Sequence, residues 1–153
     1  MKKYIPIILL SIITSLIMVK LVYDQYDTKE NIKTVFNKDE TIYLVRVGIY
    51  STFESMKENT MNLSYYIYNI ENNMYYVYVG ITKDLENYNK IAGYFKTLGY
   101  DNYRTEITIK SDAFIENLKQ YDMLLKETTD NKIVNAICSQ VLALYEELVI
   151  GED

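Results

Sequence analysis

Two copies of a short apolar pattern constrain the fold of this chain more than any other feature. Residues 43–49 read YLVRVGI and residues 75–81 read YYVYVGI, so five of seven positions match at an offset of 32 residues. Alternating Val and Tyr residues are typical of β-strands. Two copies are too few for a solenoid, which needs at least three stacked units. The repeat therefore predicts one domain built from two similar halves.

Each copy is followed by a helical pattern and then by a further strand. Apolar residues recur at helical spacing in residues 53–63 and again in residues 85–98. Residues 65–70 and 103–109 then return to a strand-like pattern. The order of elements is therefore β-α-β-β-α-β.

Polar residues and one glycine mark the ends of these elements. Ser51 or Thr52 can cap the first helix, and Asp84 can cap the second. Gly99 suits the end of the second helix, and residues 72–73, both Asn, suit a tight turn because Asn tolerates positive φ. With right-handed crossovers, the chain is expected to form an α+β domain of the ferredoxin- or RNP-like kind. Its four-stranded antiparallel sheet would have the two repeat strands at the centre and two helices on one face.

The N-terminus reads as a membrane anchor. Lys2 and Lys3 precede residues 4–23, which carry one charge, Lys20, near their end. Twenty residues suffice to cross a bilayer as a helix. The rival interpretations are a cleaved signal peptide and a buried core helix. Residues 17–20 lack the small residues that signal-peptide cleavage needs. We expect an uncleaved single-pass anchor in residues 1–23, a cytoplasmic N-terminus, a stalk in residues 24–40 and an extracytoplasmic remainder.

Composition narrows the classes of function. The net charge is −5, and all 21 acidic residues lie beyond position 23, so a phosphate backbone is a poor partner and no nucleic acid is expected. The chain has no His and a single Cys, Cys138, which argues against most zinc sites and Ser-His or Cys-His nucleophiles. Glu54 and Glu58 lie one helical turn apart, as expected of a solvated face. We therefore expect no catalysis, no metal and no cofactor.

Residues 111–150 read as a helical hairpin beyond the repeat. Two apolar stripes recur at helical spacing, with a turn around residues 128–131 between them. Cys138 lies in the second stripe and is expected to be buried. The hairpin either packs against the sheet or offers a docking surface to a protein partner.

The repeat also resembles a known family. The segments YLVRVGIY (43–50), YYVYVGI (75–81) and YFKTLGY (94–100), in this order behind an N-terminal anchor, resemble the SPOR (sporulation-related repeat) domain. The resemblance covers residues 41–110. It implies the sheet described above and binding of septal peptidoglycan, preferably glycan strands stripped of stem peptides, across the open face of the sheet. The chain departs from the family pattern at Arg46, where Gln is frequent, and at residues 81–82, where Pro-Phe is common.

Strand alternation predicts which residues form that open face. If the valines at 45, 47, 77 and 79 point to the helices, their neighbours point away, and two glycines let a ligand approach the backbone. Tyrosine rings with an arginine suit a sugar ring and its hydroxyl or carboxylate oxygens. The expected glycan-binding residues are Leu44, Arg46, Gly48, Tyr76, Tyr78, Gly80 and Arg104.

Two functions follow as hypotheses. The first is a membrane-anchored extracytoplasmic module that binds peptidoglycan glycan strands in cell division or sporulation. The second is a membrane-tethered protein–protein interaction module without glycan binding, with the C-terminal helices or the sheet face as the contact. In a third arrangement the C-terminal helices cover Tyr76 and Tyr78, and no open face remains.

Overall fold

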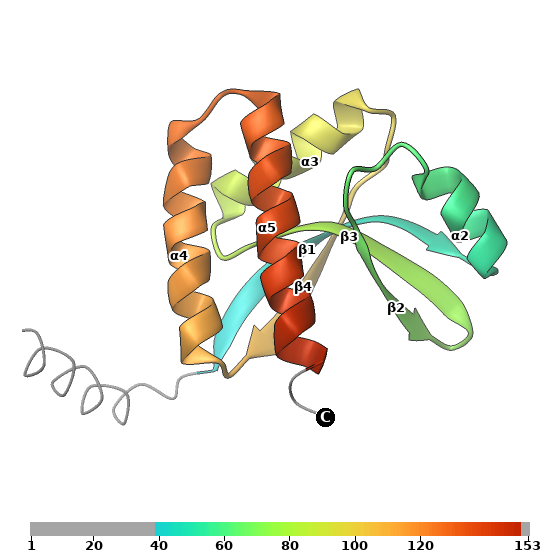
Figure 1. The fold of residues 1–153 in the computed structure, drawn as a ribbon, viewed down its shortest axis with the longest axis horizontal. Coiled ribbons are helices and arrows are strands. Elements are labelled where there is room, and N and C mark those ends of the chain that lie inside the picture. Colours follow the sequence, from blue (N-terminus) through green and yellow to red (C-terminus); the bar gives the residue numbers. More distant parts are fainter. Residues whose placement is uncertain (1–38, 151–153) are drawn as a thin grey trace, which may run out of the picture. The chain divides into compact units, whose positions relative to one another are not determined.

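The computed structural model describes residues 39–150, which form an α+β domain with a four-stranded antiparallel sheet and four helices (Figure 1). The predicted anchor in residues 1–23 and the stalk up to residue 38 lie outside the described residues. The elements, in chain order, are β1 (Glu40–Tyr50), α2 (Phe53–Thr60), β2 (Ile67–Glu71), β3 (Met74–Thr82), α3 (Leu85–Thr97), β4 (Tyr103–Ile109), α4 (Asp112–Glu127) and α5 (Asn131–Ile150).

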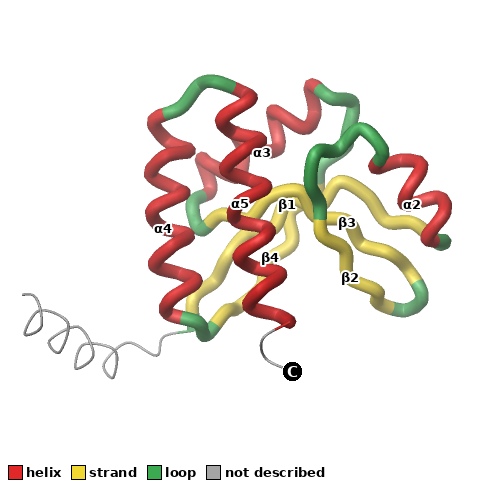
Figure 2. The backbone as a smooth tube through the Cα atoms, in the orientation of Figure 1, coloured by secondary structure: helices red, strands yellow, loops and turns green. Residues whose placement is uncertain are grey.

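The sheet has the strand order β2-β3-β1-β4 (Figure 2). The two repeat strands, β1 and β3, therefore occupy its centre, as the sequence predicts. β2 and β3 form a hairpin whose turn residues, Asn72 and Asn73, have φ of 51° and 60°. Both residues of a two-residue hairpin turn of this type need positive φ, which Asn adopts readily.

The pairing of β1 with β3 is irregular in the middle. The register shifts between Val45 and Arg46 and again between Arg46 and Gly48, so Val45 pairs with Gly80 but Arg46 pairs with Tyr78. A bulge inserts an unmatched residue and bends the strand. Strict alternation therefore does not carry through the centre of the sheet.

The helix ends follow the expected chemistry with small changes. Thr52, not Ser51, caps α2, and its hydroxyl accepts a hydrogen bond from the Ser55 amide at 3.1 Å. Asp84 caps α3 by accepting from the amides of residues 86 and 87, and Gly99 follows that helix with φ of 91°. α2 ends three residues earlier than the apolar spacing predicts.

The C-terminal helix adds cover to the sheet beyond the two helices of the repeat, which is one of the arrangements that the sequence leaves open. A Cβ placed on Gly80 would lie 2.8 Å from Ile91 of α3, so α3 packs on the face of Val45 and Gly80. Leu44, the residue before Val45, lines a groove together with Tyr145 of α5. The C-terminal half of α5 therefore lies on the face of Leu44, in front of the strands in Figure 1, while Cys138 in its first half approaches Gly80.

The core lies between these layers. Twelve large side chains are almost fully buried, and they come from the sheet, from all four helices and from both halves of the repeat. They are Phe95, Ile42, Met56, Ile81, Ile91, Leu118, Leu125, Leu142, Val45, Val77, Val79 and Val134. Burial of Val45, Val47, Val77 and Val79 confirms that these valines belong to the core.

A polar cluster fastens α4 to the turn between β3 and α3. The carboxylate of Asp122 accepts hydrogen bonds from the Thr82 hydroxyl, from the Lys83 amide at 2.9 Å and from the Asn87 side chain at 3.0 Å. Asp122 is buried, and three donors offset the cost of removing its charge from water. Lys90 adds hydrogen bonds to main-chain carbonyls at the end of α4, including that of residue 128 at 3.0 Å.

The last helix is the most apolar element described. In residues 39–150, α5 alone is long and apolar enough to cross a membrane, judged by length and composition only. One side of it is buried at Val134, Ile137, Cys138, Val141 and Leu142. Cys138 is 2% exposed, which confirms its expected burial, and burial raises the pKa of its thiol to about 12.

Candidate functional site

An arginine in cation–π contact with two tyrosines is the centre of the candidate site. The Arg46 guanidinium lies 5.6 Å from the centre of the Tyr76 ring and 5.4 Å from the centre of the Tyr103 ring. Both distances lie within the range of a cation–π interaction. Arg46 pairs with Tyr103 across β1 and β4 and with Tyr78 across β1 and β3, so three strands supply the group. We call Arg46, Tyr76, Tyr78 and Tyr103 the tyrosine–arginine patch.

The patch is partly open to solvent. Tyr103 is 53% exposed, and the other three members are half-buried. The Nε atom of Arg46 is buried without a hydrogen-bond partner. A ligand at the surface would therefore meet the two terminal nitrogens of the guanidinium, which carry its other N–H donors. Burial raises the pKa of the Tyr78 phenol, while the Arg46 charge and a hydrogen bond to Thr105 act to lower it. All four members are uncharged or cationic at neutral pH, so the patch suits a neutral or anionic ligand.

The four expected site residues of this face differ in accessibility. Leu44, Arg46, Tyr76 and Tyr78 share one face of the sheet, as predicted. However, Leu44 is only 3% exposed, because α5 covers this end of the face. Leu44 is therefore a core residue, whereas the other three remain available. The C-terminal hairpin covers part of the face and leaves the patch open.

The two glycines do not form an opening on that face. Gly80 is buried and faces α3, where an added Cβ would lie 2.8 Å from Ile91 and 3.4 Å from the Cys138 sulfur. The irregular pairing around Arg46 explains this position of Gly80. Gly80 pairs with Val45 and Tyr78 pairs with Arg46, and Val45 and Arg46 are consecutive residues that point to opposite faces. Gly48 pairs with Val77, and the Tyr50 side chain folds over it. Gly80 thus has a packing role and not the predicted ligand role.

Arg104 also lies away from the patch. It pairs with Val45 in the sheet and therefore belongs to the face that carries α3. Its guanidinium lies 5.6 Å from the centre of the Tyr43 ring and forms a salt bridge with Glu106 at 3.1 Å. The predicted second cation for the ligand is thus on the other side of the sheet.

Tyr103 is the member of the patch that sequence reasoning missed. The strand pattern places it at the start of β4, but alternation within one strand does not reveal its partner. Its place beside Arg46 follows from the register of β4 against β1. The predicted sheet could have revealed this position of Tyr103. If β1 is central and pairs with β3 on one side, then β4 must be its neighbour on the other side, and antiparallel pairing brings the start of β4 beside the second half of β1.

A groove borders the patch on the same face. It has a volume of about 860 Å³ and runs between β2 and the C-terminal half of α5. Tyr78 belongs to both the groove and the patch. The remaining lining residues are Leu44, Tyr66, Ile67, Tyr68, Asn69, Ile70, Ile107, Tyr145, Glu146, Val149 and Ile150. Apolar groups therefore dominate the groove, with a single acidic residue at its side.

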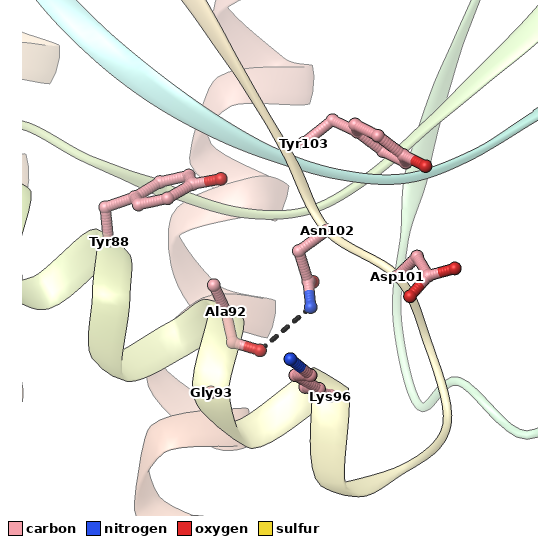
Figure 3. A pocket seen from close by; sticks show the side chains of 7 residues that line it. All are labelled: Tyr88, Ala92, Gly93, Lys96, Asp101, Asn102 and Tyr103. Atoms are coloured by element: carbon pink, nitrogen blue, oxygen red, sulfur yellow. Dashed lines mark hydrogen bonds between the residues drawn. The ribbon is translucent and has the colours of Figure 1, made fainter.

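A second hollow, of about 450 Å³, lies between α3 and the start of β4 (Figure 3). The Asn102 side chain donates hydrogen bonds to the carbonyls of Ala92 at 2.9 Å and Tyr100 at 3.0 Å. These bonds hold the loop before β4 against α3. The side-chain oxygen of Asn102, Oδ1, is buried without a hydrogen-bond partner. Lys96 and Asp101 line the hollow with opposite charges. The loop that the Asn102 bonds hold leads directly into Tyr103 at the start of β4.

Within residues 39–150, no cluster of three or more Cys, Asp or Glu side chains could hold a metal ion. The acidic Glu54 and Glu58 lie on α2 and are exposed. The arrangement at the patch can bind by stacking and hydrogen bonding.

Comparisons with family models, with curated proteins and with solved structures find no match to this chain.

Proposed function

We propose that this protein is a membrane-anchored, extracytoplasmic module that binds peptidoglycan glycan strands through the tyrosine–arginine patch. It would act by binding, without a catalytic step, in cell division or sporulation. Residues 4–23 would anchor it in the cell membrane as a single-pass helix with the N-terminus in the cytoplasm.

The observation that carries the proposal is the cation–π contact of Arg46 with both Tyr76 and Tyr103. Two ring contacts restrict the side chain of Arg46, so less conformational freedom is lost when its guanidinium donates to a ligand. Tyrosine rings offer apolar faces against the C–H faces of a sugar, and their hydroxyls remain hydrated. A glycan freed of stem peptides carries carboxylates, which a planar guanidinium can bind with two parallel hydrogen bonds.

The arrangement of strands supports the same proposal. The sheet order β2-β3-β1-β4 and the order of the elements from β1 to β4 are compatible with the sheet that the SPOR resemblance implies. In this topology the ligand would lie on the central strands. Arg46 on β1 and Tyr76 and Tyr78 on β3 are on those strands.

The alternative is a membrane-tethered module that binds a protein. The apolar groove beside α5 favours it, because an exposed apolar hollow on a folded domain is a common protein-binding feature. Binding of glycan by the patch and of protein by the groove are compatible, since Tyr78 alone among the patch residues lines both.

The proposal is tested by co-sedimentation of the full chain, in mild detergent, with purified cell wall before and after amidase treatment. The unaltered protein should pellet with the wall, and more strongly after the stem peptides are removed. Arg46→Ala and Tyr76→Ala should each weaken binding about tenfold, the equivalent of about 1.4 kcal/mol. Arg46→Lys should also weaken it, because a lysine cannot stack or bind in the same planar way.

Arg104→Ala is the matched control. It removes the same kind of charge from the same sheet, but from the face that carries α3. Equal loss of binding in Arg104→Ala and Arg46→Ala would point to non-specific attraction by positive charge. Absence of sedimentation with both wall preparations would reject the proposal.

A further inference from the structure

The outer edge of β2 has no partner strand in the described part of the chain. β2 lies at the end of the sheet, and its only strand partner is β3. An unpaired strand edge presents a row of N–H and C=O groups that can pair with another strand. Natural proteins protect such edges with Lys, Pro or bulges. The sequence of β2, IYNIE, contains neither Lys nor Pro.

The hairpin register identifies which backbone groups face outward. Glu71 and Met74 flank the two-residue turn, so they form a hydrogen-bonded pair. Hydrogen-bonded and non-hydrogen-bonded pairs alternate along an antiparallel ladder. Tyr68 and Ile70 therefore occupy non-hydrogen-bonded positions, and their N–H and C=O groups point away from β3. These four groups are spaced to pair with an added strand.

The groove follows this edge. Five consecutive residues, 66–70, line one side of it, and the last turns of α5 line the other. Figures 1 and 2 show β2 beside the C-terminal half of α5. Leu44, Tyr78 and Ile107 of the neighbouring strands complete the lining. A chain lying in this groove would pair with β2 on one side and contact the helix on the other.

Charge restricts the occupant further. Among the described residues that line the groove, Glu146 is the only charged one. The Tyr65 hydroxyl donates a hydrogen bond to it at 2.6 Å, which fixes the carboxylate at the side of the groove. Glu147 lies next to it in the sequence. An anionic ligand would be repelled here, whereas a basic side chain would be attracted.

We propose that this groove binds an extended peptide segment that adds as a fifth strand to the free edge of β2. Its side chains alternate, with apolar residues facing the groove floor and a Lys or Arg facing Glu146. Strand addition of this kind takes affinity from main-chain hydrogen bonds and specificity from alternate side chains. The inference does not depend on glycan binding, because the edge and Glu146 lie outside the tyrosine–arginine patch.

The outer edge of β2 could also pair with β2 of a second copy, and the test below distinguishes that occupant by self-association.

The test selects peptides from a phage-displayed library of random 12-residue sequences on the full chain in detergent micelles. The selected peptides should show alternating apolar residues and at least one Lys or Arg. The tightest of them is then made synthetically, and its binding is measured by fluorescence anisotropy to the unaltered chain and to three variants.

Ile70→Pro removes an outward N–H without breaking the ladder to β3, and proline is tolerated on edge strands. It should weaken peptide binding at least tenfold. Ile70→Thr, the matched control, keeps the N–H group and should weaken binding less than threefold. Glu146→Gln keeps a hydrogen-bond acceptor for Tyr65 but removes the charge, and should weaken a basic peptide about threefold. A thermal melt of each variant verifies that it is folded.

Three results would overturn the inference. The first is a selection that enriches no peptide, and the second is an enriched peptide that binds Ile70→Pro as well as the unaltered chain. The third is self-association of the chain, seen by sedimentation velocity, that Ile70→Pro abolishes while no peptide binds. That outcome would assign the edge to a second copy. Loss of wall binding in Arg46→Ala would leave all three readouts unchanged, so the two proposals fail separately.

Discussion

Gly80→Ala distinguishes a packing glycine from a ligand-binding glycine. In the structure an added Cβ would lie 2.8 Å from the Cγ2 atom of Ile91, which is fully buried. Carbon atoms in contact prefer about 3.5–4.0 Å, so Ile91 or the backbone must move by roughly 1 Å. Overpacking of this size costs about 1–3 kcal/mol. The expected fall in the thermal midpoint is roughly 4–15 °C for a domain of this size.

Thermal unfolding followed by circular dichroism measures this change, and Gly93→Ala serves as the control. No atom lies within 4 Å of a Cβ added at Gly93, which is in the middle of α3. That substitution should raise stability by about 0.5–1 kcal/mol, because Ala favours a helix over Gly. If Gly80→Ala matched the unaltered protein in stability but lost wall binding, the packing role would be wrong. The glycine would then face the ligand, as strict strand alternation predicts.

Three further predictions concern two buried groups. Asp122→Ala removes the acceptor for the Thr82, Lys83 and Asn87 donors. It should lower the free energy of unfolding, measured by urea titration, by about 3 kcal/mol or more. A loss below about 1 kcal/mol would show that this cluster does not fasten α4. Cys138 should not react with Ellman's reagent at pH 8 until the protein is unfolded, because its thiol is 2% exposed and burial raises its pKa from 9.0 to about 12. Since the unfolded thiol releases its proton near pH 9.0 and the folded one does not, stability should fall as pH rises from 9.0 towards 12.

Local sequence signals predicted the elements and the centre of the sheet. The repeat located β1 and β3, and both lie in the middle of the sheet. The turn at Asn72–Asn73, the Asp84 cap and the terminator Gly99 are confirmed, because each depends on the conformational preference of one or two residues. The helical hairpin of residues 111–150 is also confirmed, with its turn at residues 128–130.

The faces of the sheet were harder to predict, because they depend on pairing between strands. Alternation placed Gly80 beside Tyr78, but the bulges around Arg46 moved Gly80 to the α3 face. Alternation also could not show that α5 would bury Leu44, since burial depends on where the hairpin returns to the sheet. Tyr103 entered the site only through the register of β4 against β1.

The position of α5 also has a consequence for how the chain folds. This helix is the last element in the sequence, yet it covers a face built from strands that are made first. Domains fold during synthesis from the N-terminus, so the strands can pair before α5 is available. Until the final residues emerge, Leu44 remains without this cover, and its contact with the groove wall at Tyr145 spans about a hundred residues of chain. Closure of this face is therefore a late step, and a chain that ends early would retain an apolar sheet surface prone to association.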